Sequence, residues 1–401
     1  MEDKTTLHGR MMRLSLLWVA FVLGAIFWGG PVAQADGLYS GKADVSGLAF
    51  VANRDSNDVA VIDIAARKVV GRFPVGRSPH MVAISPDGRW VYTTGQSDDT
   101  LTVTRVSDFR TVATLHLGKS PEHLAVSPDG RLVLVGNFED GTVSVVDARA
   151  RREVARLAGF ARPHNITFSR DGRRAFVANL GSDRVSVVDI EAQKIVASLE
   201  AANPVKLAKL QQGRKINGII NVTLTPDGRF GYAAHADGGE VAVIDAAAAR
   251  VVKYVRVGNL PWRAYSTPDG RRMVVPNLGD RTVSVIDTAS QGVTAVLPSL
   301  EGVTGVNPAL GGRLAFVLSR SKNKVRVLDL KAKTVLKDIP VGLSPETAST
   351  TPDERFVFLA TSRSGEVWVL DAEQLSVSAV IPNVGKHPWA VTIAGGINYC
   401  H

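Results

Sequence analysis

The chain has 401 residues, of which 45% are hydrophobic and 21% are charged, and its formal net charge is +9. This composition is that of a globular protein with enough apolar residues for a large core. The single cysteine, Cys400, excludes an internal disulfide, so the core alone must hold the fold together.

The first 35 residues predict a secretory signal peptide. Arg10 and Arg13 precede an apolar run over residues 14–28, and the small-residue sequence Ala33-Gln34-Ala35 follows it. The run is shorter than the roughly 20 residues that span a bilayer. We therefore expect cleavage after Ala35, a periplasmic or secreted mature chain over residues 36–401, and no stable membrane span in that chain.

The mature chain would remain basic. Removal of residues 1–35 takes away three basic and two acidic side chains, which leaves a formal charge of +8. In an exported protein, a basic surface favours an anionic small molecule or a periplasmic protein as partner, and nucleic acid is not expected. The Lys and Arg residues are spread along the chain, so a charge that only maintains solubility is the alternative.

A turn of the Pro-Asp-Gly type recurs along the mature chain. The step between successive turns is 42 residues except for one step of 56, so one insertion of 14 residues interrupts the series. A fixed period of this length indicates a repeat architecture. The turn aspartates are Asp87, Asp129, Asp171, Asp227, Asp269 and Asp353, and Leu310-Gly311-Gly312 fills the remaining place.

Each repeat predicts four short antiparallel strands. Segments such as "FVAN" and "TVSVVD" alternate β-branched residues with small or polar ones, which is the period of a strand. Four strands in about 40–45 residues are typical of a β-propeller blade. The third strand occurs eight times, from "DVAVID" at 58 to "EVWVLD" at 366. The sequence therefore predicts an all-β, eight-bladed propeller.

The two ends of the mature chain complete each other. The first repeat lacks its innermost strand, whereas "HPWAVTIAGG" at 387–396 is an innermost strand with no blade after it. We expect this C-terminal strand to close the ring, because closure leaves no unpaired sheet edge. The recurring turn aspartates and the aspartates that end the third strands are expected to cap turns and not to carry chemistry.

The repeats resemble the YVTN type of propeller repeat, as in "FVAN" followed by "SDRVSVVDIEAQKIVASL". Proteins with such repeats include surface-layer proteins, seven-bladed lactonase-like enzymes and accessory propellers of dehydrogenases. They also include the eight-bladed d-type-haem domain of nitrite reductases with its haem-maturation relatives. The resemblance to this last group implies an eight-bladed periplasmic propeller that handles haem. The chain has no Cys-x-x-Cys-His motif, so a complete nitrite reductase is not expected.

In a propeller, the connections that enter each innermost strand lie around the mouth of the central channel, where binding residues collect. The position after the repeat's proline is a mixed ring of polar and aromatic residues. From it and its surroundings we predict ligand-binding residues and, within them, His80 and His164 as ligands of a transition metal or a haem iron. His123 is a further possible ligand. The predicted set is His80, His164, His235, Trp262, Arg263, Glu346 and Trp389.

In this interpretation, Trp262 or Trp389 stacks on a flat ligand, and three arginines pair with carboxylates: Arg54, Arg263 and Arg320. The alternative is that each histidine only bonds a neighbouring backbone group. Two other segments contain basic or metal-ligand residues. The insertion at 201–218 predicts a basic lid, a docking loop or a passive excursion, and the tail at 398–401 combines Cys400 with His401, two metal-ligand types.

The sequence is compatible with three functions. The first is a non-catalytic binding or accessory propeller in the periplasm, favoured because no catalytic motif stands out. The second is a haem-handling or redox protein related to the d-type-haem propellers. The third is a lactonase-like hydrolase, which the blade count disfavours.

Overall fold

The computed structural model describes residues 45–205 and 218–398. These residues belong to one compact unit, which extends from Gly37 to His401. The predicted signal peptide lies outside the described residues, and so do Cys400 and His401. Within the described ranges, no helix has the length and apolar character needed to cross a bilayer.

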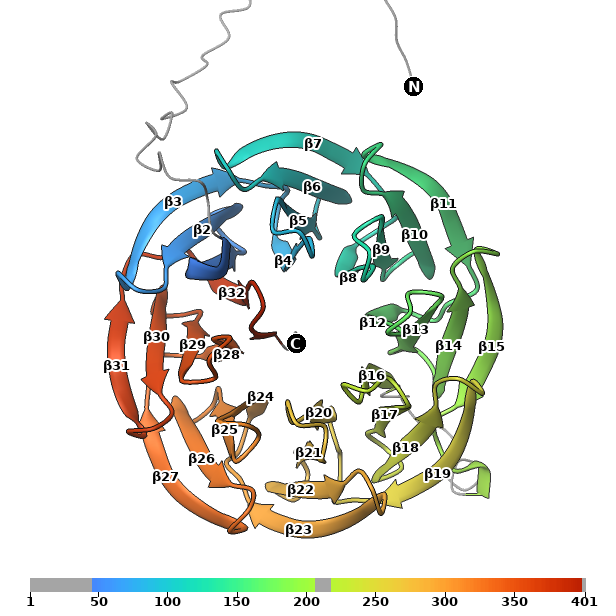
Figure 1. Cartoon of the computed structure of the whole chain (residues 1–401), viewed down its shortest axis with the longest axis vertical. Coiled ribbons are helices and arrows are strands. Elements are labelled where there is room, and N and C mark those ends of the chain that lie inside the picture. Colours follow the sequence, from blue (N-terminus) through green and yellow to red (C-terminus); the bar gives the residue numbers. More distant parts are fainter. Residues whose placement is uncertain (1–44, 206–217, 399–401) are drawn as a thin grey trace, which may run out of the picture. The chain divides into compact units, whose positions relative to one another are not determined.

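Eight antiparallel sheets are arranged in a ring around a central channel (Figure 1). The prediction of an eight-bladed, all-β propeller is confirmed. We number the blades in chain order, starting with the blade that contains β1. From the channel outward, blade 1 consists of β32 (Pro388–Ile393), β1 (Leu48–Asn53), β2 (Asp58–Asp63) and β3 (Lys68–Pro74), and blade 2 of β4 (Pro79–Ile84), β5 (Trp90–Gly95), β6 (Thr100–Arg105) and β7 (Arg110–His116). Blade 3 consists of β8 (Pro121–Val126), β9 (Leu132–Asn137), β10 (Thr142–Asp147) and β11 (Arg152–Ala158), and blade 4 of β12 (Pro163–Phe168), β13 (Arg174–Asn179), β14 (Arg184–Asp189) and β15 (Lys194–Glu200).

The second half of the ring repeats this arrangement from the channel outward. A 3-10 turn, η1 (Val45–Gly47), precedes β1, and a short strand, β33 (Ile397–Asn398), follows β32. Blade 5 consists of β16 (Ile219–Leu224), β17 (Phe230–His235), β18 (Glu240–Asp245) and β19 (Arg250–Arg256), and blade 6 of β20 (Tyr265–Ser266), β21 (Arg272–Asn277), β22 (Thr282–Asp287) and β23 (Gly292–Pro298). Blade 7 consists of β24 (Val303–Ala309), β25 (Leu314–Ser319), β26 (Lys324–Asp329) and β27 (Thr334–Pro340), and blade 8 of β28 (Pro345–Thr350), β29 (Phe356–Thr361), β30 (Glu366–Asp371) and β31 (Ser376–Ile381).

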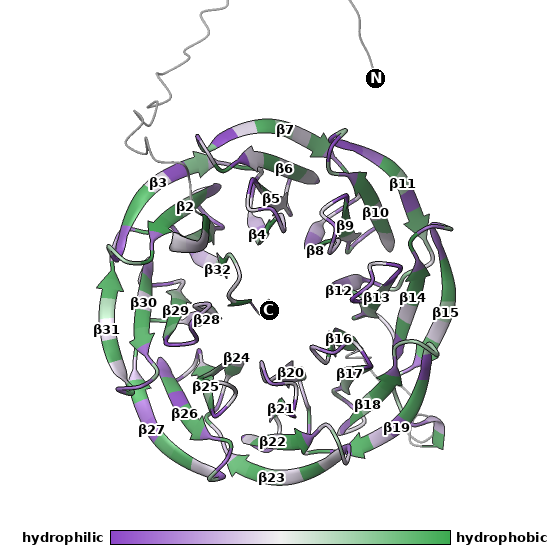
Figure 2. Cartoon of the chain, viewed as in Figure 1, coloured by the Kyte–Doolittle hydropathy of each residue, from purple (hydrophilic) through white to green (hydrophobic). Residues whose placement is uncertain are grey.

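Burial follows the position of each strand in its blade. The four central residues of β10 are all buried, since neighbouring blades cover both faces of the sheet, whereas the residues of β15 alternate between exposed and partly or fully buried. Figure 2 shows the same contrast, with hydrophobic third strands and mixed outer strands. In the outer strands, the alternation is therefore between a sheet face that packs and one that meets water, whereas in third strands such as β10 both faces are buried.

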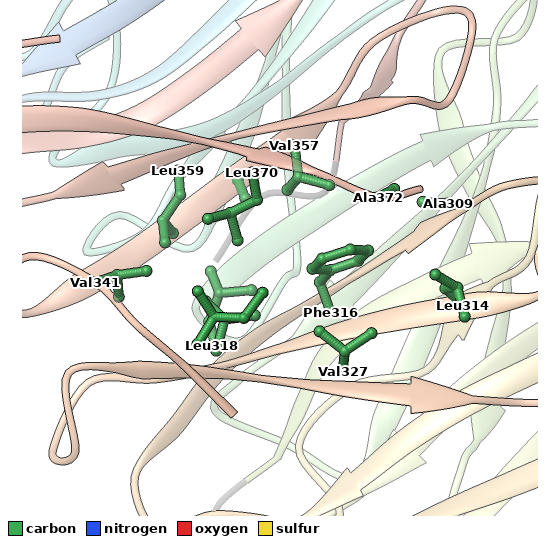
Figure 3. Packing of buried hydrophobic residues seen from close by; sticks show 13 residues of the cluster. Ala309, Leu314, Phe316, Leu318, Val327, Val341, Val357, Leu359, Leu370 and Ala372 are labelled. Atoms are coloured by element: carbon green, nitrogen blue, oxygen red, sulfur yellow. The ribbon is translucent and has the colours of Figure 1, made fainter. Parts of the chain in front are cut away.

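The core lies between adjacent blades. Between blades 7 and 8, Phe316 of β25 packs in one cluster with Leu359 of β29 and Leu370 of β30 (Figure 3). All three are completely buried. Equivalent clusters fill the other spaces between blades, so the stability of the ring depends on face-to-face packing of apolar side chains.

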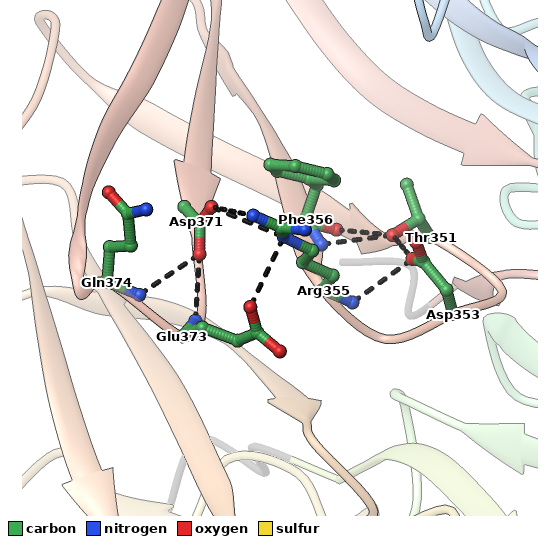
Figure 4. A network of polar contacts seen from close by, with 7 residues as sticks. All are labelled: Thr351, Asp353, Arg355, Phe356, Asp371, Glu373 and Gln374. Atoms are coloured by element: carbon green, nitrogen blue, oxygen red, sulfur yellow. Dashed lines mark hydrogen bonds and ion pairs between the residues drawn. The ribbon is translucent and has the colours of Figure 1, made fainter.

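The recurring aspartates cap turns, as predicted. In blade 8, Asp353 accepts hydrogen bonds from the Thr351 hydroxyl and from the backbone N–H of Arg355, and Asp371 accepts the backbone N–H of Gln374 at 3.0 Å (Figure 4). In blade 3, the Ser127 hydroxyl and a backbone N–H hold the pKa of Asp129 below its usual value. These carboxylates have structural partners and are not a reactive site.

The C-terminal strand closes the ring, as predicted. β32 pairs with β1 through four successive residues, from Ala49 opposite Ile393 to Ala52 opposite Ala390. One feature was missed by the sequence analysis. β33 adds a fifth strand to blade 8, where Asn398 lies opposite Ser349 on the channel side of β28. The final described residues therefore line the channel.

The insertion at 201–218 lies between β15 and β16, in the connection from the outermost strand of blade 4 to the innermost strand of blade 5. Its basic residues, Lys206, Lys209, Arg214 and Lys215, lie outside the described residues. The prediction of a lid or docking loop stays a prediction.

Candidate binding face at the channel mouth

Two kinds of connection meet on one face of the ring, which we call the mouth face. They are the loop that enters each innermost strand and the loop between the second and third strands. In blade 1, the N–H of Arg54 donates to the carbonyl of His387 at 3.0 Å, and in blade 3 the N–H of Phe138 donates to the carbonyl of Ser120 at 2.9 Å. These backbone bonds hold the two loops of a blade side by side.

A β-bulge lies at the mouth end of most innermost strands. In blade 3, Pro121 pairs with Asn137 and Leu124 pairs with Val135, so Glu122 and His123 together oppose one residue of β9. Blades 2, 4, 5 and 8 have the same irregularity. A bulge redirects side chains from strict alternation. Two successive residues at a bulge can therefore both point toward the mouth of the channel, instead of to opposite faces of the sheet.

Three histidines and one glutamate lie together where blades 2–4 meet the mouth. His123 Nε2 is 3.0 Å from His164 Nε2, and the rings of His80 and His123 have centroids 5.2 Å apart. His164 Nε2 also lies 3.9 Å from Glu122 Oε2. Ligand-type atoms of His80, Glu122 and His123 lie within 4.8 Å of one another. We call these four residues the histidine cluster, and all four are buried.

Groups around the histidine cluster orient it. Gln96 Nε2 donates to Glu122 Oε1 at 2.7 Å, and Arg54 Nη2 donates to Gln96 Oε1 at 2.8 Å. Burial raises the pKa of Glu122 to about 7, against the opposing charge of Arg54 and the hydrogen bond from Gln96. Burial also lowers the pKa of Arg54, although the charge of Glu122 opposes that shift.

The fourth predicted histidine is not part of this cluster. The N–H of Gly238 donates to His235 Nδ1 at 2.9 Å, so Nε2 carries the proton and donates to Asp183 Oδ1 at 2.6 Å. His235 thus links blade 5 to the loop after β13 of blade 4. The structure brings His80 and His164 together through His123 and leaves His235 apart.

Trp389 of β32 lies between charged groups. The guanidinium carbon of Arg54 is 4.6 Å from the centroid of its ring, and that of Arg320 is 5.8 Å away. The ring of His80 lies 5.8 Å from it, centroid to centroid. The face of Trp389 that was expected to stack on a ligand is therefore already close to guanidinium groups, which stabilise it by cation–π attraction.

Glu346 of β28 is only 2% exposed and forms an ion pair with Arg320, which follows β25. The hydroxyls of Ser344 and Ser362 also donate to Glu346 Oε1, at 3.1 and 2.7 Å. The predicted carboxylate partner of an arginine at the mouth is thus a residue of the protein itself.

The mouth face also contains a cavity of about 530 Å³ over blades 6–8. We call it the anion cavity, because two guanidinium groups line it. Trp262, Leu278 and Leu343 form apolar parts of its wall, and Arg320 and Arg363 contribute guanidinium groups. In Figure 1, the innermost strands of blades 6–8 lie across the channel from those of blades 2–4. The anion cavity and the histidine cluster are therefore separate places on one face.

Arg263 does not share the position of its neighbour Trp262. It is 2% exposed and lines a second cavity of about 510 Å³ inside the channel, together with Asn165 and Asn221. Asn165, Asn221 and Arg263 are each the second residue after the repeat's proline or its equivalent. Asn398 of β33 lines the same cavity.

Sequence reasoning omitted Glu122 from the predicted site and gave His123 only as a further possibility. Strict alternation assigns adjacent residues to opposite faces, and the bulge overrides it. Gln96 and Arg54 were not recognised as supports of Glu122, because they reach it from loops of blades 2 and 1. Two signals were available: the adjacent titratable pair after Pro121, and the repeat position that Glu122 shares with His80 and His164.

A family model described as YNCE-like beta-propeller matches residues 91–395. The seven-bladed beta-propeller protein Rv1057 of Mycobacterium tuberculosis is 29% identical over 129 residues, which are 31% of this chain and 33% of that protein. The chain thus matches about a third of the length of this relative. Such a segment amounts to about three repeats and does not determine the number of blades.

Two solved structures have a similar fold. Dihydro-heme d1 dehydrogenase NirN in complex with DHE has a TM-score of 0.73 and 20% identity, covering 89% of this chain and 77% of that chain. The Hydrazine Synthase of Kuenenia stuttgartiensis has a TM-score of 0.56 and 24% identity, covering 73% of this chain and 95% of that chain. At these identities the likeness shows the fold alone, and the expected resemblance to d-type-haem propellers is confirmed at that level.

Proposed function

The chain belongs to the YNCE-like β-propeller family, and we propose that it is an exported binding protein that takes a small organic anion on its mouth face. The observation that carries this proposal is the anion cavity over blades 6–8. Its volume of about 530 Å³ is in the range of small-molecule sites, which are concave, mostly apolar and equipped with a few polar groups.

The chemistry of the wall defines the class of ligand. Trp262 and Leu278 offer apolar contact, and the side chain of Leu343 is 53% exposed at the cavity. A guanidinium group binds a carboxylate through two parallel hydrogen bonds. Arg320 is paired with Glu346, whereas Arg363 has no ion pair with any of the described residues. A ligand with a flat apolar body and one carboxylate satisfies both parts of the wall.

Benzoate is the probe that tests this proposal. We expect saturable binding of benzoate to the mature protein in calorimetric titration, and a loss of affinity of at least about 10-fold in Arg363→Ala, because a hydrogen-bonded charge contributes about 1.5–3 kcal/mol. Arg256→Ala, on the outer strand β19, is the matched control and should bind as the wild type does.

Benzamide has the same shape without the charge and should bind more weakly than benzoate. Equal binding of benzamide and benzoate, or unchanged affinity in Arg363→Ala, would contradict recognition of a carboxylate at this cavity.

The structural likeness to NirN raises haem handling as a second candidate function. The histidine cluster does not fit a haem held by two histidines. Two axial imidazoles lie on opposite sides of a flat macrocycle, whereas the Nε2 atoms of His123 and His164 are 3.0 Å apart and in direct hydrogen-bond contact. All four cluster residues are also buried against one another. We therefore derive no haem chemistry from this site.

Export is part of the proposal, and it rests on the N-terminal sequence. We expect the mature protein to begin at Asp36, because the charged start, the apolar run and the Ala33-Gln34-Ala35 site occur in the order that signal peptidase requires. Intact-mass spectrometry of protein from the native host, after cell fractionation, measures this. A periplasmic or secreted form that retains residues 1–35 would show that the segment is not a cleaved signal.

A further inference from the structure

The histidine cluster has the donor set and the spacing of a metal centre. We propose that His80, Glu122, His123 and His164 bind one divalent first-row transition-metal ion at the mouth of the channel. This site is separate from the anion cavity, since it is built by blades 2–4 and the cavity by blades 6–8.

The distances fit one ion. Nitrogen and oxygen ligands lie about 2.0–2.2 Å from zinc, so two ligand atoms of a tetrahedral site are about 3.4 Å apart. The contacts of His164 Nε2 bracket this value, at 3.0 Å from His123 Nε2 and 3.9 Å from Glu122 Oε2. One ligand-type atom of His80 lies within 4.8 Å of those of Glu122 and His123. His164 joins this group through its contacts with His123 and Glu122.

The groups behind the ligands are those that orient metal ligands. His164 Nδ1 lies 3.0 Å from the carbonyl oxygen of Ile220, so Nδ1 carries the proton and Nε2 presents its lone pair to the cluster, where it accepts a hydrogen bond from His123 Nε2. Metal binding through His123 Nε2 therefore requires the other His123 tautomer, with the proton on Nδ1. Gln96 donates to Glu122 Oε1 and leaves Oε2 as the oxygen that faces His164. A backbone carbonyl behind an imidazole and an amide behind a carboxylate are typical of outer-shell support.

The backbone explains how the ligands converge. His80, Glu122 and His164 hold equivalent positions in three consecutive blades, immediately after Pro79, Pro121 and Pro163. The bulge in blade 3 adds His123 from the next position. The ligands therefore come from rigid strands and not from mobile loops, which keeps their geometry precise.

The donor set selects the class of ion. Imidazole nitrogen suits zinc, copper, iron and nickel, whereas calcium and magnesium prefer oxygen ligands. Three imidazoles and one carboxylate give an ion such as Zn²⁺ four protein ligands, and Glu122 is the one charged group among these four. This is a site for a resident borderline ion, and Mg²⁺ is the natural negative control.

The test uses the full mature chain, stripped with EDTA and titrated with ZnCl₂ by calorimetry. We expect one zinc per chain and no heat from MgCl₂. Cobalt(II) in the same site should produce the visible absorption of four-coordinate cobalt with imidazole ligands, which a site without histidine would not give. Zinc should also raise the melting temperature, and EDTA should reverse the rise.

Variants identify the ligands. Loss of an outer-shell group costs about 10–100-fold in metal affinity, so loss of a ligand should cost about 100-fold or more. We expect this in Glu122→Gln, which keeps the volume of the side chain, and in His123→Ala, and about 10-fold in Gln96→Ala. Melting curves in EDTA must show that each variant is folded. His116→Ala, on the exposed end of β7, is the matched control.

The tail supplies the competing site, because Cys400 and His401 are also ligand types. The double variant Cys400→Ser, His401→Ala should bind zinc as the wild type does. Absence of one-to-one zinc binding, undiminished affinity in folded Glu122→Gln and His123→Ala, or loss of binding only in the tail variant would each overturn the proposal. The zinc and benzoate titrations concern different residues, so failure of one leaves the other standing.

Discussion

Removal of residues 385–401 is expected to abolish cooperative folding. The deletion takes away β32, the innermost strand of blade 1, and leaves β1 with an unpaired edge. It also exposes apolar residues of the cluster between blades 8 and 1, including Val51, and removes Val391 and Ile393 from that cluster. An unpaired edge beside exposed apolar surface leads to aggregation. Thermal unfolding followed by circular dichroism, together with gel filtration, measures the effect.

A shorter deletion provides the control. Removal of residues 398–401 keeps β32 and loses the two hydrogen bonds between the Asn398 side chain and the backbone of Ile393, both 2.8 Å long. At about 1 kcal/mol for each bond, we expect a loss of about 2 kcal/mol in the free energy of unfolding with the fold retained. If the longer deletion melted cooperatively at the wild-type temperature, the ring would not depend on closure by β32.

Replacement of Arg320 by alanine is expected to lower the free energy of unfolding by about 2–3 kcal/mol. Breaking a buried ion pair costs about 3–5 kcal/mol, because the remaining charge stays buried without its partner. Glu346 is 2% exposed, but the side chain of Arg320 is 43% exposed, so the cost should fall below that range. Urea titration at pH 7 measures it.

The double variant Arg320→Ala, Glu346→Gln separates the charge from the packing. A neutral amide at position 346 retains hydrogen bonding to Ser344 and Ser362 and carries no buried charge. We therefore expect the double variant to recover more than half of the stability that Arg320→Ala loses. Identical stability of the single variant and the wild type would mean that the pair contributes nothing measurable.

The seven predicted site residues do not form one group in the structure. Seven residues were chosen from or near the mouth of the channel, and the structure places Trp262 and Glu346 around blades 6–8 and His80 and His164 around blades 2–4. Arg263 faces the channel interior and His235 bonds Asp183, so neither joins the groups expected of it. Neighbouring positions in the sequence therefore have different surroundings in the ring.

The fold could be predicted because its information is local and periodic. A turn such as the one at Asp129 is specified by four or five adjacent residues, and the alternation in "TVSVVD" specifies a strand without knowledge of its partner. Counting these units yields eight blades, and an innermost strand within 387–396 with no blade of its own predicts closure of the ring.

The composition of the site depends on contacts between blades, which no local pattern records. His123 reaches His164 because a bulge in β8 shifts it from the face that alternation assigns, and whether a bulge forms depends on the pairing of β8 with β9. Trp262, Arg320 and Arg363 surround one cavity although they belong to three blades. The sequence by itself determined the number of blades and the strand that closes the ring, because repeated short-range patterns specify them. Only the tertiary structure decided which side chains meet at the mouth, because loops from different blades come together there only after the ring has closed.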